Sequence, residues 1–271
     1  MELLKEQGSR EYHLKQPPTP LLPHSLLSCS LPFPMNLTTL SQEQERLATQ
    51  LIIPPDGTGY QPQADDLIFT LDVQYLVNKA HIVLDVQRWS GEQVAIYVAS
   101  SKVTIPYVPQ FFCFREGPPL LALIQKVQRQ FNRRPDLILV DGHGLAHPRR
   151  FGVACWVGLK TNIPTIGCAK RSLLAYTKAK RATSQRGDTV PIHDQADLVG
   201  TALTTQSKVK PVFVSPGHLV SHKTATQMVL GLASRYRLPE PIRRADQHAR
   251  NYAKGQLLPN ATDLGQLIGH G

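Results

Sequence analysis

The segment after the apolar run 137–139 concentrates residue types that can do chemistry. A carboxylate at the end of a buried strand, followed by Gly-x-Gly, marks a place where the backbone leaves a sheet and can approach a ligand closely. This pattern predicts a metal-dependent site that cleaves phosphodiester bonds. The alternative is an ordinary exit from a strand, in which the aspartate and glycines only make the turn. The residues concerned are Asp141, Gly142, His143, Gly144, His147, Arg149 and Arg150.

A second carboxylate, Asp72, interrupts the apolar run 67–73. A buried carboxylate is costly unless it is paired or bound to a metal, so Asp72 is a candidate metal ligand. The alternative is that Asp72 lies on the solvent face of an alternating strand. Mg²⁺ prefers oxygen ligands and keeps several waters, so two or three carboxylates and a substrate phosphate suffice to hold it. We expect Mg²⁺, with Mn²⁺ as a substitute, to generate hydroxide and to stabilise developing charge.

A rigid turn presents one aromatic ring, because Pro106 and Pro109 flank Tyr107 at fixed backbone angles. Enzymes that inspect a base displace it from the duplex, and a preorganised ring can fill the vacated space. We therefore interpret Tyr107 as a wedge that contacts nucleic acid. The alternative is a packing residue at the end of a strand.

Two further strand ends carry candidate groups. Lys170 follows the small residues of the run 164–169, where its ammonium could stabilise a phosphate or an oxyanion. It begins a stretch, 170–181, with five basic residues and no acidic one, which suits contacts to a duplex backbone or a solvated loop. His218 follows Ser-Pro-Gly at another strand end, where it either closes the turn or supports the site.

The order of elements predicts an α/β fold with a mixed sheet covered by helices. Three consecutive strands with short links suggest an antiparallel meander, and the alternation that follows suggests parallel strands. This is the order of the ribonuclease H-like fold, in which Asp72, Glu116 and Asp141 would meet at one point. The predicted strands are 67–73, 80–86, 93–103, 137–140, 165–168 and 212–214, and the predicted helices start near Ser41, after Pro118-Pro119, at 151–159, at 221–236 and around 243–246.

We expect one catalytic domain over residues 36–255. Residues 1–35 are rich in proline and serine, which predicts either a disordered extension or a mis-assigned start with translation from Met35. Residues 256–271 are expected to form a flexible tail.

The basic composition fits a nucleic-acid partner. The 271 residues carry 30 Lys and Arg against 20 Asp and Glu, a formal charge of +10, and 41% are hydrophobic. The four cysteines are widely spaced and form no Cys-x-x-Cys pair, which is typical of buried thiols in a reducing compartment. We find no apolar segment long enough to span a bilayer and no secretory leader, so we expect a cytoplasmic protein without membrane contact.

Several motifs, in the same order throughout residues 40–250, resemble the endonuclease V family. The resemblance implies a Mg²⁺-dependent deoxyinosine 3′ endonuclease that recognises deaminated bases in double- or single-stranded DNA. It implies cleavage at the second phosphodiester bond on the 3′ side of the lesion, which leaves the base in place, and we expect a monomer. The motifs are the 106–109 turn, 114–119, 140–150, Lys170, 215–218 and 236–241.

Carried over residue by residue, the resemblance implies a role for each position. Asp72 and Asp141 would bind the metal, with Asp246 as a further acidic ligand. Glu116 would be the third active-site carboxylate, and His147 and Lys170 would support catalysis. The residues implied in DNA binding are Tyr107, Pro106, Pro109, Gly142, Gly144, Gly167 and His218.

Three positions depart from the family pattern: Cys113, Trp156 and Cys168. The cysteines are compatible in size with the small residues usual there, whereas Trp156 replaces a frequent histidine. Two other functions stay open. One is a ribonuclease H-like nuclease acting on inosine-containing RNA or branched DNA, and the other is a non-catalytic nucleic-acid-binding protein.

Overall fold

The computed structural model describes residues 36–177 and 183–267. The sequence predicts that residues 1–35 are either a disordered extension or lie before a translation start at Met35. These residues lie outside the described part of the chain. So do three of the basic residues of the 170–181 stretch, Lys178, Lys180 and Arg181. Residues Leu37–Gly271 form one compact unit.

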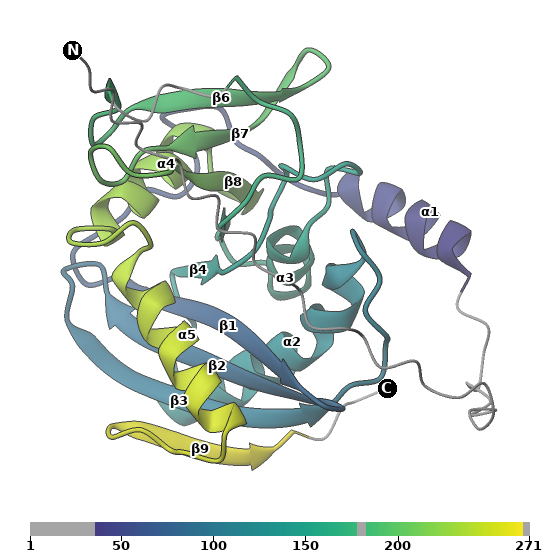
Figure 1. Ribbon diagram of the computed structural model, residues 1–271, viewed down its shortest axis with the longest axis vertical. Helices are drawn as coiled ribbons and strands as arrows, with labels where there is room; N and C mark the ends of the chain where they lie inside the picture. The colour runs from purple at the N-terminus through teal and green to yellow at the C-terminus, as the bar shows by residue number, and fades with distance from the viewer. Residues whose placement is uncertain (1–35, 178–182, 268–271) are drawn as a thin grey trace, which may run out of the picture. The chain divides into compact units, whose positions relative to one another are not determined.

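The described residues form one nine-stranded sheet in the order β6-β7-β8-β5-β4-β1-β2-β3-β9 (Figure 1). The first three strands are an antiparallel meander, and β4 and β5 add to β1 in parallel, as the sequence predicts. The mixed sheet with helices confirms the predicted α/β fold class. The strands are β1 Leu67–Leu76, β2 Lys79–Arg88, β3 Gln93–Lys102, β4 Leu137–Val140, β5 Thr165–Ala169, β6 Thr189–Asp194, β7 Asp197–Leu203, β8 Val212–His218 and β9 Ala261–Gln266.

Helices cover both faces of the sheet because side chains alternate along each strand. Phe69 and Leu71 of β1 pack with α2 and α3, whereas Ile68 of the same strand packs with α4 and α5. No helix in the described part of the chain is long and apolar enough to cross a membrane. The helices are α1 Leu37–Ala48, α2 Phe112–Phe131, α3 Val153–Thr161, α4 His222–Leu232 and α5 Glu240–Ala253.

The second half of the sheet differs from the prediction. Strand β8 runs antiparallel to β5, and the hairpin β6–β7, which the sequence analysis missed, extends the same sheet edge. Its strands carry Pro191, Gly200 and charged residues at the turn, so they show little apolar alternation. The expectation of a flexible tail is also wrong for residues 261–266, because β9 pairs in parallel with β3.

Helix α2 begins at Phe112, six residues before Pro118, so that Pro118 and Pro119 lie inside it and not before it. Proline inside a helix removes a backbone hydrogen bond, which is why the sequence favours a start at the prolines. The buried positions Cys113, Gly117 and Leu120 nevertheless keep helical spacing across this stretch. The early start matters for function, because it puts Glu116 on a helix.

A buried ion pair fixes α5 to the sheet. The guanidinium of Arg244 on α5 donates from Nε to Oδ2 of Asp85 at 2.7 Å and from Nη2 to Oδ1 at 2.8 Å. Asp85 lies on β2 and is fully buried. Two parallel bonds fix orientation as well as distance, so the pair sets how α5 lies on β2. Asp246 lies two residues further along the same helix.

Removing Arg244 should therefore destabilise the protein strongly. Arg244→Leu leaves Asp85 as a buried charge without its partner, which typically costs about 3–5 kcal/mol. Denaturant unfolding measures the loss. The matched control is Arg243→Leu, because Arg243 is exposed and stacks on Tyr236, a contact worth about 1 kcal/mol or less. Equal losses in the two variants would show that the Asp85 pair does not anchor α5.

Candidate active site

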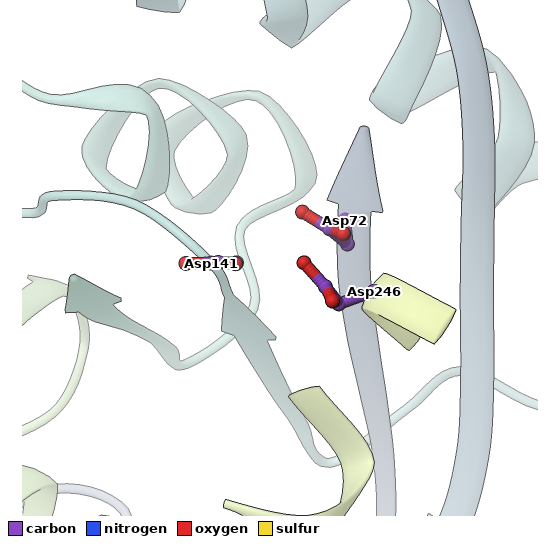
Figure 2. A group of neighbouring side chains, drawn as sticks. All are labelled: Asp72, Asp141 and Asp246. Carbon is purple, nitrogen blue, oxygen red and sulfur yellow. The ribbon is translucent and has the colours of Figure 1, made fainter. Parts of the chain in front are cut away.

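Three carboxylates converge at the end of β4. Asp72 comes from β1, Asp141 follows β4 directly, and Asp246 comes from α5, as Figure 2 shows. Each offers an oxygen atom, and these three atoms lie within 4.8 Å of one another.

The register of the sheet explains why Asp72 and Asp141 meet. Val140 pairs with Leu71, and the backbone N–H of Asp141 donates to the carbonyl of Leu71 at 3.0 Å. Strand β4 ends there, so the aspartate that follows it stands beside the next residue of β1, which is Asp72. An aspartate after a short parallel strand is therefore brought to its partner by backbone pairing alone.

The arrangement fits a divalent cation. Burial raises the pKa of Asp72 to about 7, and the charge of Asp141 contributes to the shift. Burial also raises the pKa of Asp141. Carboxylates this close and this buried are stable as anions only when positive charge is supplied. Three carboxylate oxygens that converge are the donor set that a hard cation such as Mg²⁺ prefers.

Lys170 supplies part of that positive charge. Its ammonium Nζ lies 2.6 Å from Oδ2 of Asp141 and 3.2 Å from Oδ1 of Asp246. Burial opposes the charge on Lys170, yet the carboxylates of Asp141, Asp72 and Asp246 outweigh it and raise the pKa of the lysine. The lysine is therefore a fixed cation beside the carboxylates at neutral pH.

Glu116 approaches the carboxylates from α2. It shares a cavity of about 30 Å³ with Asp72 and Asp141. Burial raises the pKa of Glu116 to about 8, and the charges of Asp72 and Asp141 add to the shift. From the sequence, Asp72, Glu116 and Asp141 are predicted to meet at one point. In the structure Asp246 completes the close group of three oxygen donors, and Glu116 lines the adjoining cavity.

A second cavity, of about 210 Å³, adjoins the carboxylates and has the character of a ligand pocket. Phe112, Val153 and Leu173 give it apolar walls. Three residues, Glu116, Asp141 and Lys170, belong both to it and to the acidic site. Apolar walls with a few convergent polar groups are typical of small-molecule sites. Neither Phe112 nor Leu173 was singled out from the sequence as a site residue.

The three glycines predicted to bind DNA have different positions. Gly142 lines the 210 Å³ cavity. Gly144 and Gly167 lie against backbone instead. A Cβ on Gly167 would come within 2.5 Å of the backbone nitrogen of Gly144, and one on Gly144 would collide with the carbonyl of Pro216. These two positions require glycine because strand ends and loop backbone touch there, which fixes the loop 141–150 against β5 and β8.

His147 bridges two loops through both ring nitrogens. Its Nε2 donates to the carbonyl of Gln110 at 3.0 Å, and its Nδ1 accepts from the backbone N–H of Arg149 at 3.2 Å. Burial, with a contribution from Arg149, lowers the pKa of His147 to about 4. The ring is therefore neutral near pH 7, and both of its nitrogens are already engaged.

The predicted wedge is exposed. Tyr107 has 61% of its surface accessible, and its ring meets that of Phe112 edge-on at a centroid distance of 5.1 Å. Pro106 and Pro109 are exposed on either side of it. Because Phe112 also lines the 210 Å³ cavity, the exposed ring stands next to the pocket.

His218 does not belong to this site. It is buried, pairs with Thr165 at the start of β5, and accepts from the backbone N–H of Ile52 at 3.2 Å. Lys170 follows the other end of β5, so the strand separates the two residues. The expected DNA contact by His218 is therefore corrected: its ring holds the segment before β1 against β8.

Arg237 is a residue that the sequence analysis missed. Its guanidinium donates to three carbonyls, those of Lys170 and Pro211 at 2.8 Å each and that of Lys210 at 2.9 Å. It thereby fixes the backbone that carries Lys170. The sequence signal was weak, because Arg237 appeared only within the motif 236–241 and no pattern connects it to β5.

Comparisons with known proteins agree with this geometry. The model of a family described as Endonuclease V matches residues 56–247. Endonuclease V of Geotalea uraniireducens is 44% identical over 229 residues, which cover 83% of this chain and 92% of that protein.

Solved structures give the same result. The crystal structure of Endonuclease V from Streptomyces avermitilis has a TM-score of 0.71 and 35% identity, and the match covers 82% of this chain and 95% of that one. Ciona intestinalis Endonuclease V, in complex with a 24mer DNA containing an inosine followed by a ribo-adenosine, has a TM-score of 0.71 and 28% identity, and the match covers 81% and 98%.

If Asp246 binds the metal, removing its charge should weaken metal binding without unfolding the chain. For Asp246→Asn we expect the affinity for Mn²⁺, followed by electron paramagnetic resonance of the free ion, to fall at least about tenfold. Asp263→Asn is the matched control, since Asp263 lies on β9 and bonds Tyr252. Equal Mn²⁺ affinity in the two variants would exclude Asp246 as a ligand.

Proposed function

Because the chain belongs to the endonuclease V family, we propose that it is a DNA repair endonuclease that recognises deaminated bases, chiefly deoxyinosine. It hydrolyses the second phosphodiester bond on the 3′ side of the lesion. The observation that carries the proposal is the convergence of Asp72, Asp141 and Asp246, with Lys170, beside a cavity of about 210 Å³. A site for cutting and a pocket for a base thus share three residues, Glu116, Asp141 and Lys170.

The metal of the proposed reaction is Mg²⁺, with Mn²⁺ as a substitute. Asp72, Asp141 and Asp246 would hold it, and when bound it supplies Lewis acidity, which lowers the pKa of water and neutralises charge on the phosphate. Lys170 donates from Nζ to a non-bridging oxygen of the scissile phosphate. Fixed positive charge of this kind stabilises the extra negative charge that builds up as the phosphorus is attacked.

Glu116 acts as the general base in this proposal. Burial and the neighbouring carboxylates raise its pKa to about 8, towards the neutral range in which a general base is most effective. Its carboxylate accepts a proton from the attacking water. His147 has a different role: its two engaged nitrogens and its low pKa support a positioning function rather than proton transfer.

Base recognition uses the pocket and the exposed turn together. The flipped base enters between Phe112 and Leu173, and the backbone of Gly142 faces its edge. Tyr107 fills the gap that the base leaves in the stack. Gly144 and Gly167 shape the pocket indirectly, because they allow the loop 141–150 to lie against β5 and β8. Pro106 and Pro109 hold Tyr107 in place.

Inosine-containing RNA is the second candidate substrate. The Ciona intestinalis relative was crystallised with a DNA in which a ribo-adenosine follows the inosine, so that protein accommodates a ribose next to the lesion. We propose that the chain acts as a monomer on either substrate. A non-catalytic binding protein is disfavoured because the three carboxylates and Lys170 are all in place.

The direct test of the proposed function uses an end-labelled duplex with one deoxyinosine. We expect purified protein and Mg²⁺ to leave a nick one nucleotide beyond the lesion. A duplex with deoxyadenosine at the same position should stay intact, and Asp141→Asn should not cut either substrate. Uncut deoxyinosine duplex, with a protein that is folded by circular dichroism, would refute the proposal. The same assay on an inosine-containing RNA ranks the two substrates.

The wedge can be tested separately. Tyr107→Ala should reduce cleavage of deoxyinosine in duplex DNA by about ten- to a hundredfold, because the displaced base can then restack. Cleavage of the same lesion in a single strand should change little, since no opposing strand closes the gap. Tyr236→Ala is the control, because Tyr236 is also exposed. Equal loss on both substrates would refute the wedge role.

A further inference from the structure

One side chain of α1 is fully buried although it is polar and lies outside the acidic site. Gln44 has none of its surface accessible. Burying an amide without hydrogen bonds is costly, so a buried glutamine is retained only where its bonds are satisfied. All of the partners of Gln44 are far away in sequence, and they belong to the segments that surround the pocket.

The amide of Gln44 connects three segments. Its Nε2 donates to the carbonyl of Phe151 at 2.9 Å and to the carbonyl of Gln110 at 3.1 Å, and lies 3.3 Å from Sγ of Cys113. Its Oε1 accepts from Nε of Arg149 at 2.7 Å. Gln44 thus bonds the loop that carries Tyr107, the start of α2 and the end of the loop that carries Asp141.

The carbonyl of Gln110 is the centre of these contacts. It accepts from Nε2 of Gln44, from Nε2 of His147 at 3.0 Å and from Nη2 of Arg149 at 2.9 Å. Gln110 has a φ of 69°, in the left-handed region that a residue with a side chain seldom adopts. Three donors from two other segments stabilise this conformation. Gln110 stands three residues after Tyr107, at the base of its loop.

We propose that Gln44 is a positioning residue that holds the wedge loop, residues 104–111, against the nuclease loop, residues 141–150, so that Tyr107 and the base pocket stay in register. The inference rests on the proposed function of the acidic site. Arg149 shares the task, because its guanidinium also lies over the ring of Phe111 at 4.3 Å. Gln44 itself reaches no carboxylate of the acidic site, so it acts only through the loops.

The geometry predicts that loss of the Gln44 hydrogen bonds impairs recognition of the lesion in duplex DNA and leaves hydrolysis of the phosphodiester bond unaffected. Without the donors of Gln44, the carbonyl of Gln110 keeps His147 and Arg149, so the protein should still fold. The base of the wedge loop becomes looser, and a misplacement of about 1 Å that a mutation causes far from the chemistry can cost about a hundredfold in rate. Only a duplex substrate needs the wedge, so only the rate of duplex cleavage should fall.

The experiment compares Gln44→Met and Gln44→Glu with matched changes at Gln42, which is exposed on the same helix. Gln44→Met removes all hydrogen bonds at similar length, and Gln44→Glu keeps the acceptor for Arg149 but removes the donors. We expect kcat on deoxyinosine duplex to fall about tenfold or more in both, with KM and single-strand cleavage within about twofold of wild type. Gln42→Met and Gln42→Glu should match wild type on both substrates.

Hydrogen–deuterium exchange of residues 104–112 supplies a readout that does not need activity. Faster exchange there in both Gln44 variants, with the Gln42 variants unchanged, supports the inference even if the substrate is another nucleic acid. Unchanged exchange, or equal loss of cleavage on duplex and single strand, overturns it. Wild-type protein that leaves deoxyinosine duplex uncut would instead refute the proposed function, so the two failures are distinguishable.

Discussion

The repulsion among carboxylates that are held together in a partly buried place is the constraint on which the rest of the structure depends. Asp72, Asp141 and Asp246 repel one another at this distance, and burial makes the charges of Asp72 and Asp141 more costly still. Each carboxylate is therefore carried by an element whose position is fixed by other contacts. The sheet register fixes Asp72 and Asp141, and the buried pair of Arg244 with Asp85 fixes the helix that carries Asp246.

The cation beside the carboxylates is held as firmly as they are. Lys170 follows β5, and Arg237 binds the carbonyl of Lys170, so the ammonium is fixed by the backbone below it as well as by its own ion pairs. Gly167 on the same strand lies against the backbone of Gly144. This contact holds the nuclease loop against β5, and residues of both segments line the neighbouring pocket. The ion pairs of Lys170 and the backbone packing of Gly167 thus fix the same strand relative to the nuclease loop.

Much of this could be predicted from the sequence, for identifiable reasons. Asp72 stood out because a carboxylate in an apolar strand needs an explanation, and Asp141 because it follows a short apolar run. Asp246 could be found only by resemblance. The local sequence of a polar helix does not indicate which of its side chains faces a strand that is distant in sequence. The β6–β7 hairpin was missed because its strands lack strong apolar alternation, and β9 was missed because it pairs with β3, which lies far away in sequence. Gln44 gave no signal, because burial of a glutamine depends on where a helix docks.

Hydrolysis of the phosphodiester bond and selection of the substrate depend on different parts of the fold. The acidic site depends on central strands and α5, which are held by long sheet pairing and a buried ion pair. The wedge loop is an exposed turn whose base is fixed mainly by hydrogen bonds to the carbonyl of Gln110. Single hydrogen bonds contribute about 1 kcal/mol each, so the turn is more easily altered than the carboxylates. Because His147 and Arg149 lie on the nuclease loop and bind that carbonyl, the position of Tyr107 is tied to the loop that ends β4, and the choice of substrate can change while the chemistry stays intact.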